Sequence, residues 1–157
     1  MLIIIITTSE SIMSIIRFDS WGGENGIEQF IKDQTGCKPY SGAGINPRPR
    51  DRTTILRSVD DTYYYDDDLS NSERVKYTLF GHNGDQDVNE RKFNEPFLNK
   101  DKTTHIYLYR VKPHSSKKNK NEYLWYGKYE LSGMHEQIHP GKDYINRKII
   151  IVSLKKV

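Results

Sequence analysis

The stretch from residue 65 to residue 78 reads Tyr-Asp-Asp-Asp-Leu-Ser-Asn-Ser-Glu-Arg-Val-Lys-Tyr-Thr. Tyr63 to Tyr65 and Val75 to Phe80 have the composition of two strands joined by a polar turn. Two tyrosines on neighbouring strands can face each other across a slot, and a planar ring between them stacks on both faces. A carboxylate at the rim, such as Asp68, can accept a hydrogen bond from an amino group like that of cytosine. The residues are therefore compatible with a pocket for an extruded base. Tyrosines in strands are nevertheless more often core residues, and an aspartate run is more often a solvated turn.

Short strands dominate the rest of the chain. We expect them at residues 53–56, 105–111, 122–131 and 148–154, with a helix at 27–35, a second short helix at 89–98 and a turn at 140–143. Residues 1–6 form either a first strand or a disordered start. Gly36 closes the first helix. Glycines, prolines and arginines predict a long basic loop from Tyr40 to Arg52, and Pro113 to Asn121 reads as a lysine-rich loop. The predicted class is α+β, a β-rich barrel of curved mixed sheet with a few short helices.

Length and composition set broad limits. The 157 residues fit a single domain, and the net charge of +3 weakly favours a polyanionic partner. The single cysteine, Cys37, excludes a disulfide framework within the chain and a multi-cysteine zinc site. Residues 1–6 are apolar but too short for a membrane span and lack the basic start of a signal peptide. We expect a soluble intracellular protein with no membrane partner.

The order of motifs resembles that of the SET-and-RING-associated domain, also called the SRA or YDG domain, which has a PUA-like barrel. In that family a Tyr-x-Asp-Asp element precedes a Tyr-Thr-Gly element, with the tyrosines twelve positions apart, as Tyr65 and Tyr77 are here. Further similar segments follow in the family's order: Gly44-Ile45, Thr54 to Leu56, Gly84 to Gln86 with Asn94, His105 to Arg110, Tyr126 to Tyr129 and Arg147 to Leu154. The resemblance covers about residues 40–157, and residues 1–39 form an N-terminal strand and helix extension.

Three positions depart from the family pattern. Tyr63 and Tyr64 stand where the family has Gly-Gly, Leu79 replaces the glycine after Tyr-Thr, and no aspartate separates Tyr126 from Gly127. Glycine permits a close backbone approach, so these changes can narrow or reshape a pocket. Animal members also carry a long finger where this chain has only residues 79–84. The short segment argues against strict hemimethyl recognition and is similar to bacterial members fused to restriction nucleases.

The resemblance implies a DNA-binding reader that flips 5-methylcytosine or 5-hydroxymethylcytosine out of duplex DNA. The implied pocket consists of Tyr65, Asp68, Tyr77 and Thr78, with the two rings around the base and Asp68 on its amino group. The implied DNA contacts are Arg48, Arg50, Arg52, His82, Asn83 and Gln86. The arginines can equally form a solvated loop. The lysines from Lys117 to Lys120 either touch phosphates or belong to a plain hairpin loop.

We expect no catalysis, no cofactor and no metal in this chain. Asp85 or Asp87 with Glu90-Arg91-Lys92 superficially resembles a nuclease site, but such a site needs a strand, and this segment is polar and turn-flanked. The histidines show no zinc-ligand spacing. The expected partner is double-stranded DNA with a modified cytosine, located in a nucleus or in a bacterial cytoplasm and nucleoid. A nuclease or chromatin protein is a further candidate partner. Two alternatives remain: the recognition subunit of a modification-dependent restriction system, and a PUA-like module for RNA or a small ligand.

Overall fold

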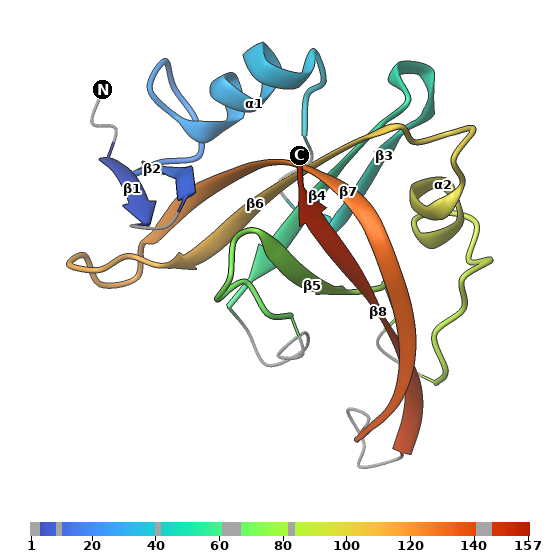
Figure 1. Cartoon of the computed structure of the whole chain (residues 1–157). Helices are drawn as coiled ribbons and strands as arrows, with labels where there is room; N and C mark the ends of the chain where they lie inside the picture. Colours follow the sequence, from blue (N-terminus) through green and yellow to red (C-terminus); the bar gives the residue numbers. More distant parts are fainter. Residues whose placement is uncertain (1–3, 9–10, 40–41, 61–66, 82–83, 141–145) are drawn as a thin grey trace.

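A computed structural model describes residues 4–8, 11–39, 42–60, 67–81, 84–140 and 146–157 (Figure 1). The strands are β1 (Ile4–Thr8), β2 (Ser11–Phe18), β3 (Ile45–Arg48), β4 (Thr53–Val59), β5 (Arg74–Thr78), β6 (His105–Pro113), β7 (Asn121–Pro140) and β8 (Asn146–Lys156). The helices are α1 (Ile27–Thr35), α2 (Asn94–Leu98) and the 3-10 turn η1 (Pro49–Asp51). The predicted strand at 63–65 lies outside the described residues, and so does the predicted turn at 140–143 apart from Pro140, the last residue of β7.

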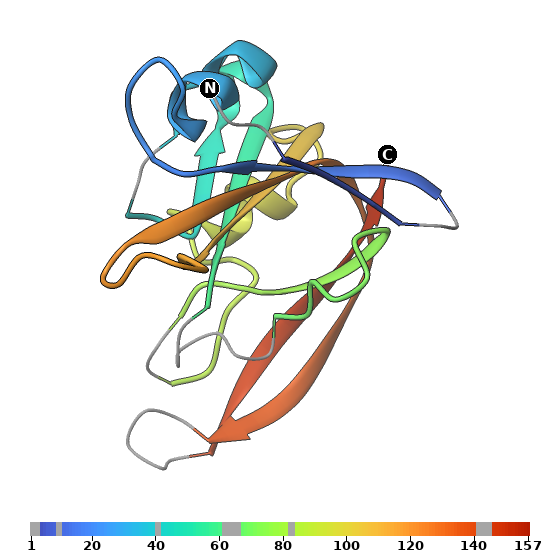
Figure 2. The ribbon, with the colours of Figure 1, turned by 90° about the vertical axis from the view of Figure 1, so that its left-hand side faces the viewer.

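One mixed sheet contains all of these strands. Its main path runs β1-β2-β7-β6-β4-β3, and β8 pairs with both β7 and β5. The β4–β6 pair is parallel and the other pairs are antiparallel. Within the described chain the sheet curves strongly without closing, because β1 and β3 each pair on one edge (Figures 1 and 2). The predicted β-rich fold of curved mixed sheet with short helices is confirmed.

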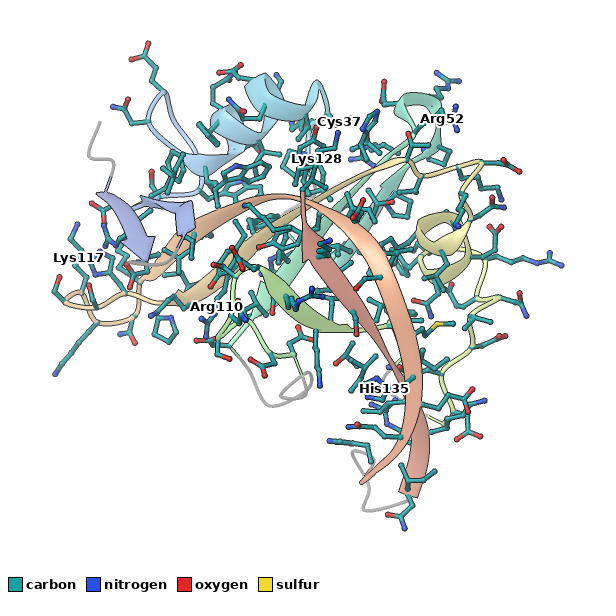
Figure 3. All side chains as sticks on the ribbon, viewed as in Figure 1. Cys37, Arg52, Arg110, Lys117, Lys128 and His135 are labelled. Carbon is teal, nitrogen blue, oxygen red and sulfur yellow. The ribbon has the colours of Figure 1, made fainter. Side chains whose placement is uncertain are left out.

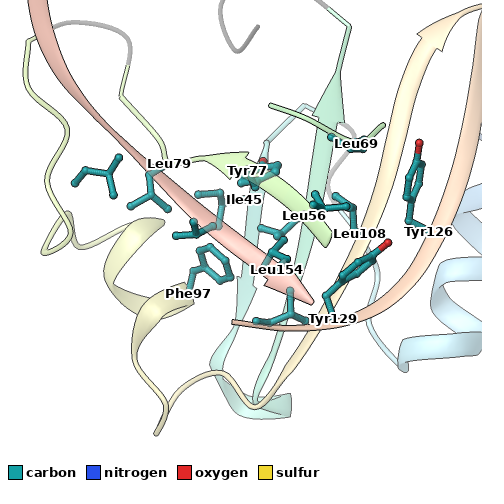
Figure 4. Close-up of a cluster of buried hydrophobic side chains, with 14 of the residues drawn as sticks. Ile45, Leu56, Leu69, Tyr77, Leu79, Phe97, Leu108, Tyr126, Tyr129 and Leu154 are labelled. Atoms are coloured by element: carbon teal, nitrogen blue, oxygen red, sulfur yellow. The ribbon is translucent and has the colours of Figure 1, made fainter. Parts of the chain in front are cut away.

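The sheet has a hydrophobic cluster on each face. Successive residues of β4 alternate between them, so Leu56 joins one cluster and Ile55 the other, both fully buried. The first cluster lies among β4 to β8 and α2, and Figure 4 shows Leu56, Leu108 and Tyr77 within it. The second lies between the sheet and α1. The sheet therefore supplies two cores, one on each side of β4 and β6.

Helix α1 covers the second cluster and matches the predicted range of residues 27–35. Ile27 and Ile31, one helical turn apart, are both buried. Gly36 has φ 74° and donates its backbone N–H to Lys32 O, which ends the helix in the left-handed conformation that glycine adopts without penalty. Cys37, directly after this cap, is 3% exposed and belongs to the same cluster.

Strand β8 has the continuous burial that its apolar run predicts. Residues 149–152 are each at most 3% exposed, although successive side chains point to opposite faces. The strand lies between β5 and β7, so its backbone is also covered on both edges over part of its length. The prediction of a strand buried on both faces is confirmed.

Three predicted boundaries are wrong. The expected basic loop up to Arg52 contains β3 and η1; Pro47 is tolerated because β3 is an edge strand that pairs only with β4 in the described sheet. The strand expected to end at residue 131 continues as β7 to Pro140, paired with β8. The expected helix from residue 89 is confined to α2, and β2 was not expected at all.

Candidate nucleic-acid interface

A cluster of polar groups lies where β4 and β5 end. The Asp67 carboxylate accepts a hydrogen bond from Ser58 Oγ at 2.7 Å on one oxygen and from the Thr78 backbone N–H at 2.7 Å on the other. Asp67 is half-buried and belongs to no helix or strand. Hydrogen bonds to a charged acceptor are stronger than neutral ones. Asp67 therefore ties the end of β4 to the end of β5.

Thr78 brings an unused hydrogen-bonding group to this cluster. The residue is 4% exposed, and its hydroxyl oxygen is buried with no hydrogen-bond partner among the residues that the structure describes. A buried polar group without a partner costs about 1–3 kcal/mol. An unpaired buried group in a native fold calls for an explanation. One explanation is a ligand that forms the missing hydrogen bond when it binds.

Tyr77 forms the inner side of the cluster. It is 4% exposed within the first hydrophobic cluster, and its hydroxyl donates to Arg57 O at 2.9 Å. A Cβ on Gly44 would lie 3.1 Å from that hydroxyl, so the absence of a side chain there lets β3 approach the tyrosine. Gly44 and Tyr77, far apart in the sequence, thus meet. Stacking of a base on Tyr77 requires one face of this packed ring to become accessible.

The neighbouring acids Asp67 and Asp68 have different surroundings. Asp68 is exposed, and its carboxylate accepts the Ser70 hydroxyl at 2.6 Å and the Ser70 backbone N–H at 3.0 Å. The hydroxyl and then the backbone bond hold the pKa of Asp68 below its usual value. The acid whose side chain bonds to both β4 and β5 is Asp67, which the sequence did not single out, whereas Asp68 pairs with Lys76 of β5 through its backbone. The role of Asp68 on a base stays a prediction, and Tyr65 lies outside the described residues.

Gln86 serves the fold from a buried position. Its amide nitrogen donates to Leu79 O at 2.7 Å and Gly81 O at 3.1 Å, and its oxygen accepts the Ile150 backbone N–H at 2.8 Å. Buried Arg147 also donates to Gly81 O, at 2.5 Å. Gly81 and Gln86 are thus fastened to β8. A DNA contact from Gln86 would require these bonds to break, and His82 and Asn83 lie outside the described residues.

The three predicted arginines lie at the beginning of β4. Arg48 donates to Lys38 O at 2.6 Å, Arg52 lies 3.5 Å from Lys100 O, and Arg50 is exposed on η1. From residue 53 to Ser58 a strand spans about 17 Å at roughly 3.3 Å per residue. The arginines and the Asp67 cluster are therefore at opposite ends of β4, a separation that the sequence alone did not indicate.

The described residues contain neither a candidate metal site nor a helix able to span a membrane. In the described ranges, no group of three or more histidine, cysteine, aspartate or glutamate residues is arranged to hold a metal ion. Among the same residues, no helix is both long and apolar enough to cross a bilayer.

The curved sheet is that of SRA-type domains and of the DNA-recognition domains of bacterial restriction enzymes that act on modified DNA. The MspJI restriction endonuclease in complex with a 27-mer oligonucleotide matches with a TM-score of 0.64 at 13% identity, over 90% of this chain and 41% of that chain. KRYPTONITE in complex with mCHH DNA, an H3(1–15) peptide and SAH matches with a TM-score of 0.59 at 19% identity, over 90% and 31%. The DNA recognition domain of the cytosine modification-dependent restriction endonuclease LpnPI matches with a TM-score of 0.59 at 11% identity, over 98% and 73%.

These likenesses are of fold, because every identity is below a fifth. The chain spans about a third of the length of the KRYPTONITE chain that it matches. No protein-family model and no curated protein matches the sequence. The fold expected from the order of motifs is confirmed from the three-dimensional structure.

Proposed function

We propose that this chain is a DNA-binding reader that takes a modified cytosine, 5-methylcytosine or 5-hydroxymethylcytosine, out of the duplex into a pocket at the end of β4 and β5. The observation that carries the proposal is the buried Thr78 hydroxyl, which has no hydrogen-bond partner in the described part of the chain and lies next to the Asp67 carboxylate, in a fold shared with domains whose solved complexes contain DNA. The ring of Tyr77 stacks on one face of the flipped base, and the ring of Tyr65 stacks on the other. Flipping costs a few kcal/mol, which base stacking and phosphate contacts return.

The reader role requires no reaction in this chain. A base held between rings and fixed by a hydroxyl and backbone groups is recognised by its shape and its hydrogen-bonding edge. The LpnPI domain, of which this chain covers 73%, is the recognition part of an enzyme that depends on cytosine modification. We therefore propose that a nuclease, on another chain or domain, is the functional partner. A chromatin partner is the alternative suggested by the KRYPTONITE likeness.

The decisive measurement is affinity for one duplex carrying cytosine, 5-methylcytosine or 5-hydroxymethylcytosine at a single position. We expect tighter binding to at least one modified duplex than to the unmodified duplex, with RNA of the same sequence as competitor. Fluorescence of 2-aminopurine placed next to the target cytosine, which stays paired with guanine, rises when the target base leaves the stack. Equal affinity for all three duplexes, or preference for RNA, would overturn the reader proposal.

A pair of isosteric variants tests the pocket itself. Thr78→Val removes a hydroxyl that has no hydrogen-bond partner among the described residues, so we expect stability to be kept or raised but preference for modified cytosine to be reduced. Thr54→Val is the matched control, because the Thr54 hydroxyl is equally buried but lies 2.8 Å from the Thr103 hydroxyl. This control should lose stability, by about 1 kcal/mol, and keep its preference. Unchanged preference in Thr78→Val would remove Thr78 from the pocket.

A further inference from the structure

The turn between β6 and β7 concentrates positive charge at its tip. Lys117, Lys118 and Lys120 are all exposed, and the described structure records no salt bridge for any of them. Asn119 has φ 58°, and His114 N–H donates to Lys120 O at 2.9 Å, which closes the turn. Three neighbouring exposed cations are suited to a polyanion, although the charge of Lys117 also acts on Asp19.

His114 holds the backbone of this turn. Its side chain is 4% exposed, and its Nδ1 accepts the backbone N–H groups of Ser116 at 3.1 Å and Lys117 at 3.0 Å. Its Nε2 lies 2.9 Å from Asp19 Oδ1. A ring fixed on both nitrogens presents the lysines on an ordered backbone, and order in the free protein lowers the entropic cost of binding.

Arg17 forms ion pairs with the acidic residues beside the turn. It forms ion pairs with Asp19 at 2.7 Å and with Glu122, whose side chain is 5% exposed. The pair with Glu122 joins β2 to β7, and the hydrogen bond that Arg17 donates to the Glu122 carboxylate is the largest influence on the pKa of Arg17, which it raises. Arg17 and His114 are thus the groups that pair directly with these acids, Lys117 acts on Asp19 only through its charge, and all three lysine side chains stay exposed to solvent.

The fold places this turn on the same side as the Asp67 cluster. β6 runs parallel to β4, with Arg110 level with Ser58, so β6 continues past the end of β4 into the turn. From Arg110 to Pro113 a strand advances about 10 Å. In Figure 3, Lys117 lies on the side of Arg110, and Arg52 lies at the opposite side of the molecule. Phosphates that flank a base held near Ser58 are therefore nearer to the lysine turn than to the arginines.

We infer that Lys117, Lys118 and Lys120 contact the DNA phosphates beside the base pocket, with His114 as the residue that positions them, and that Arg48, Arg50 and Arg52 do not. The inference rests on the proposed function and goes further, since it assigns the phosphate contacts to one of two basic segments. Arg48 and Arg52 already donate to backbone carbonyls at the other end of β4, and Arg50 is exposed at that same end.

Two triple variants of equal charge change test the assignment. One replaces Lys117, Lys118 and Lys120 by alanine, and the matched control replaces Arg48, Arg50 and Arg52 by alanine. The dissociation constant is measured for modified and unmodified duplexes from about 50 to 200 mM salt, after thermal melting confirms folding. Each lost phosphate contact lowers the salt slope by about 0.9. We expect a fall of roughly two to three for the lysine variant and none for the arginine variant.

The outcomes separate this inference from the reader proposal. Phosphate contacts carry no sequence information, so the lysine variant should keep the ratio of affinities for modified and unmodified duplexes. The lysine variant can have a reduced salt slope while the unaltered protein shows no preference for modified cytosine. That result supports the lysine contacts and refutes the reader proposal. A preference in the unaltered protein, with the slope lost only in the arginine variant, refutes the lysine contacts and supports the reader. Absence of salt-dependent binding overturns both.

The positioning role of His114 has its own readout. His114→Ala should expose the amides of Ser116 and Lys117 to hydrogen exchange and weaken binding several-fold while all three lysines remain. His114→Asn offers an oxygen that can accept the same N–H groups and should recover part of both effects. Lost amide protection with unchanged DNA affinity would refute the positioning role.

Discussion

The two ends of β4 differ in how their polar side chains are used. At the beginning of the strand, Arg48 and Arg52 direct their guanidinium groups to backbone carbonyls of neighbouring loops. At the end, Asp67 joins two strands, and the Thr78 hydroxyl is buried without a partner in the described structure. The beginning of β4 has the more conspicuous sequence because three arginines are close together there. The end of the strand has the Thr78 hydroxyl, the group that is available to a ligand. Charge density in a sequence therefore indicates a class of partner better than it locates the contact.

The largest expected effect is that of Asp67→Ala. The substitution leaves the Thr78 N–H and the Ser58 hydroxyl without their acceptor, and at about 1–3 kcal/mol for each such group we expect a loss of about 2–6 kcal/mol. Asp68→Ala, next to it in the chain, removes bonds within an exposed turn and should cost less than about 1 kcal/mol. Urea unfolding at pH 7 measures both. Equal losses would mean that Asp67 does not hold the two strands together.

Tyr77→Phe should have the next largest effect. The substitution keeps the ring and removes the hydrogen bond to Arg57 O, which is worth about 1 kcal/mol. If the ring stacks on a base, preference for modified cytosine should persist in Tyr77→Phe and disappear in Tyr77→Ala. Arg48→Ala provides a comparison from the other end of β4, because it also removes one hydrogen bond to a backbone carbonyl. We expect its modified-cytosine preference to be unchanged.

Asp19→Asn tests the ion pairs next to the lysine turn through their pH dependence. Hydrogen bonds from His114 and then Arg17 hold the pKa of Asp19 below its usual value of 3.8. A carboxyl whose pKa is lowered on folding contributes stability that is present above about pH 4 and is lost as the pH falls through the folded-state pKa. Thermal melting from about pH 5 to pH 2 should therefore show a shallower acid loss in Asp19→Asn. Parallel curves would contradict the pairing.

Gly44→Ala should have the smallest effect. Its new methyl group would lie 3.1 Å from the Tyr77 hydroxyl, so the ring or β3 must shift by a few tenths of an ångström. We expect a loss of stability well below that of Tyr77→Phe, read from the melting temperature. In the double variant Gly44→Ala with Tyr77→Phe the clash is removed, and the effect of the methyl group should vanish. Additive effects would show that the contact is not felt.

Segments with a clear period or a clear end could be predicted from the sequence. The range of α1 follows from its isoleucines at helical spacing and from Gly36, and the strand β8 follows from its long apolar run. Strand β7 was predicted too short, because residues 132–136 are all exposed and show no alternation. β3 was missed because its proline is typical of loops and is compatible with a strand only at an edge.

The candidate site was predictable in part. The resemblance drew attention to residues 65–78, which contribute the Asp67, Tyr77 and Thr78 cluster. It selected Asp68 by spacing, whereas the contacts between strands belong to Asp67, since adjacent residues in an extended chain point to opposite sides. The position of the arginines could not be predicted, because it depends on the direction of β4 relative to the loop that precedes it. Only the paired strands supply that direction.

The burial of Cys37 makes the protein convenient for site-specific labelling. The only thiol in the chain is 3% exposed beneath the end of α1, and burial raises its pKa, so little of the reactive thiolate forms near neutral pH. A maleimide dye should therefore attach to a cysteine introduced at Asn119 much faster than to the native one. The rate at which Cys37 itself is labelled then measures how often α1 separates from the sheet by local unfolding.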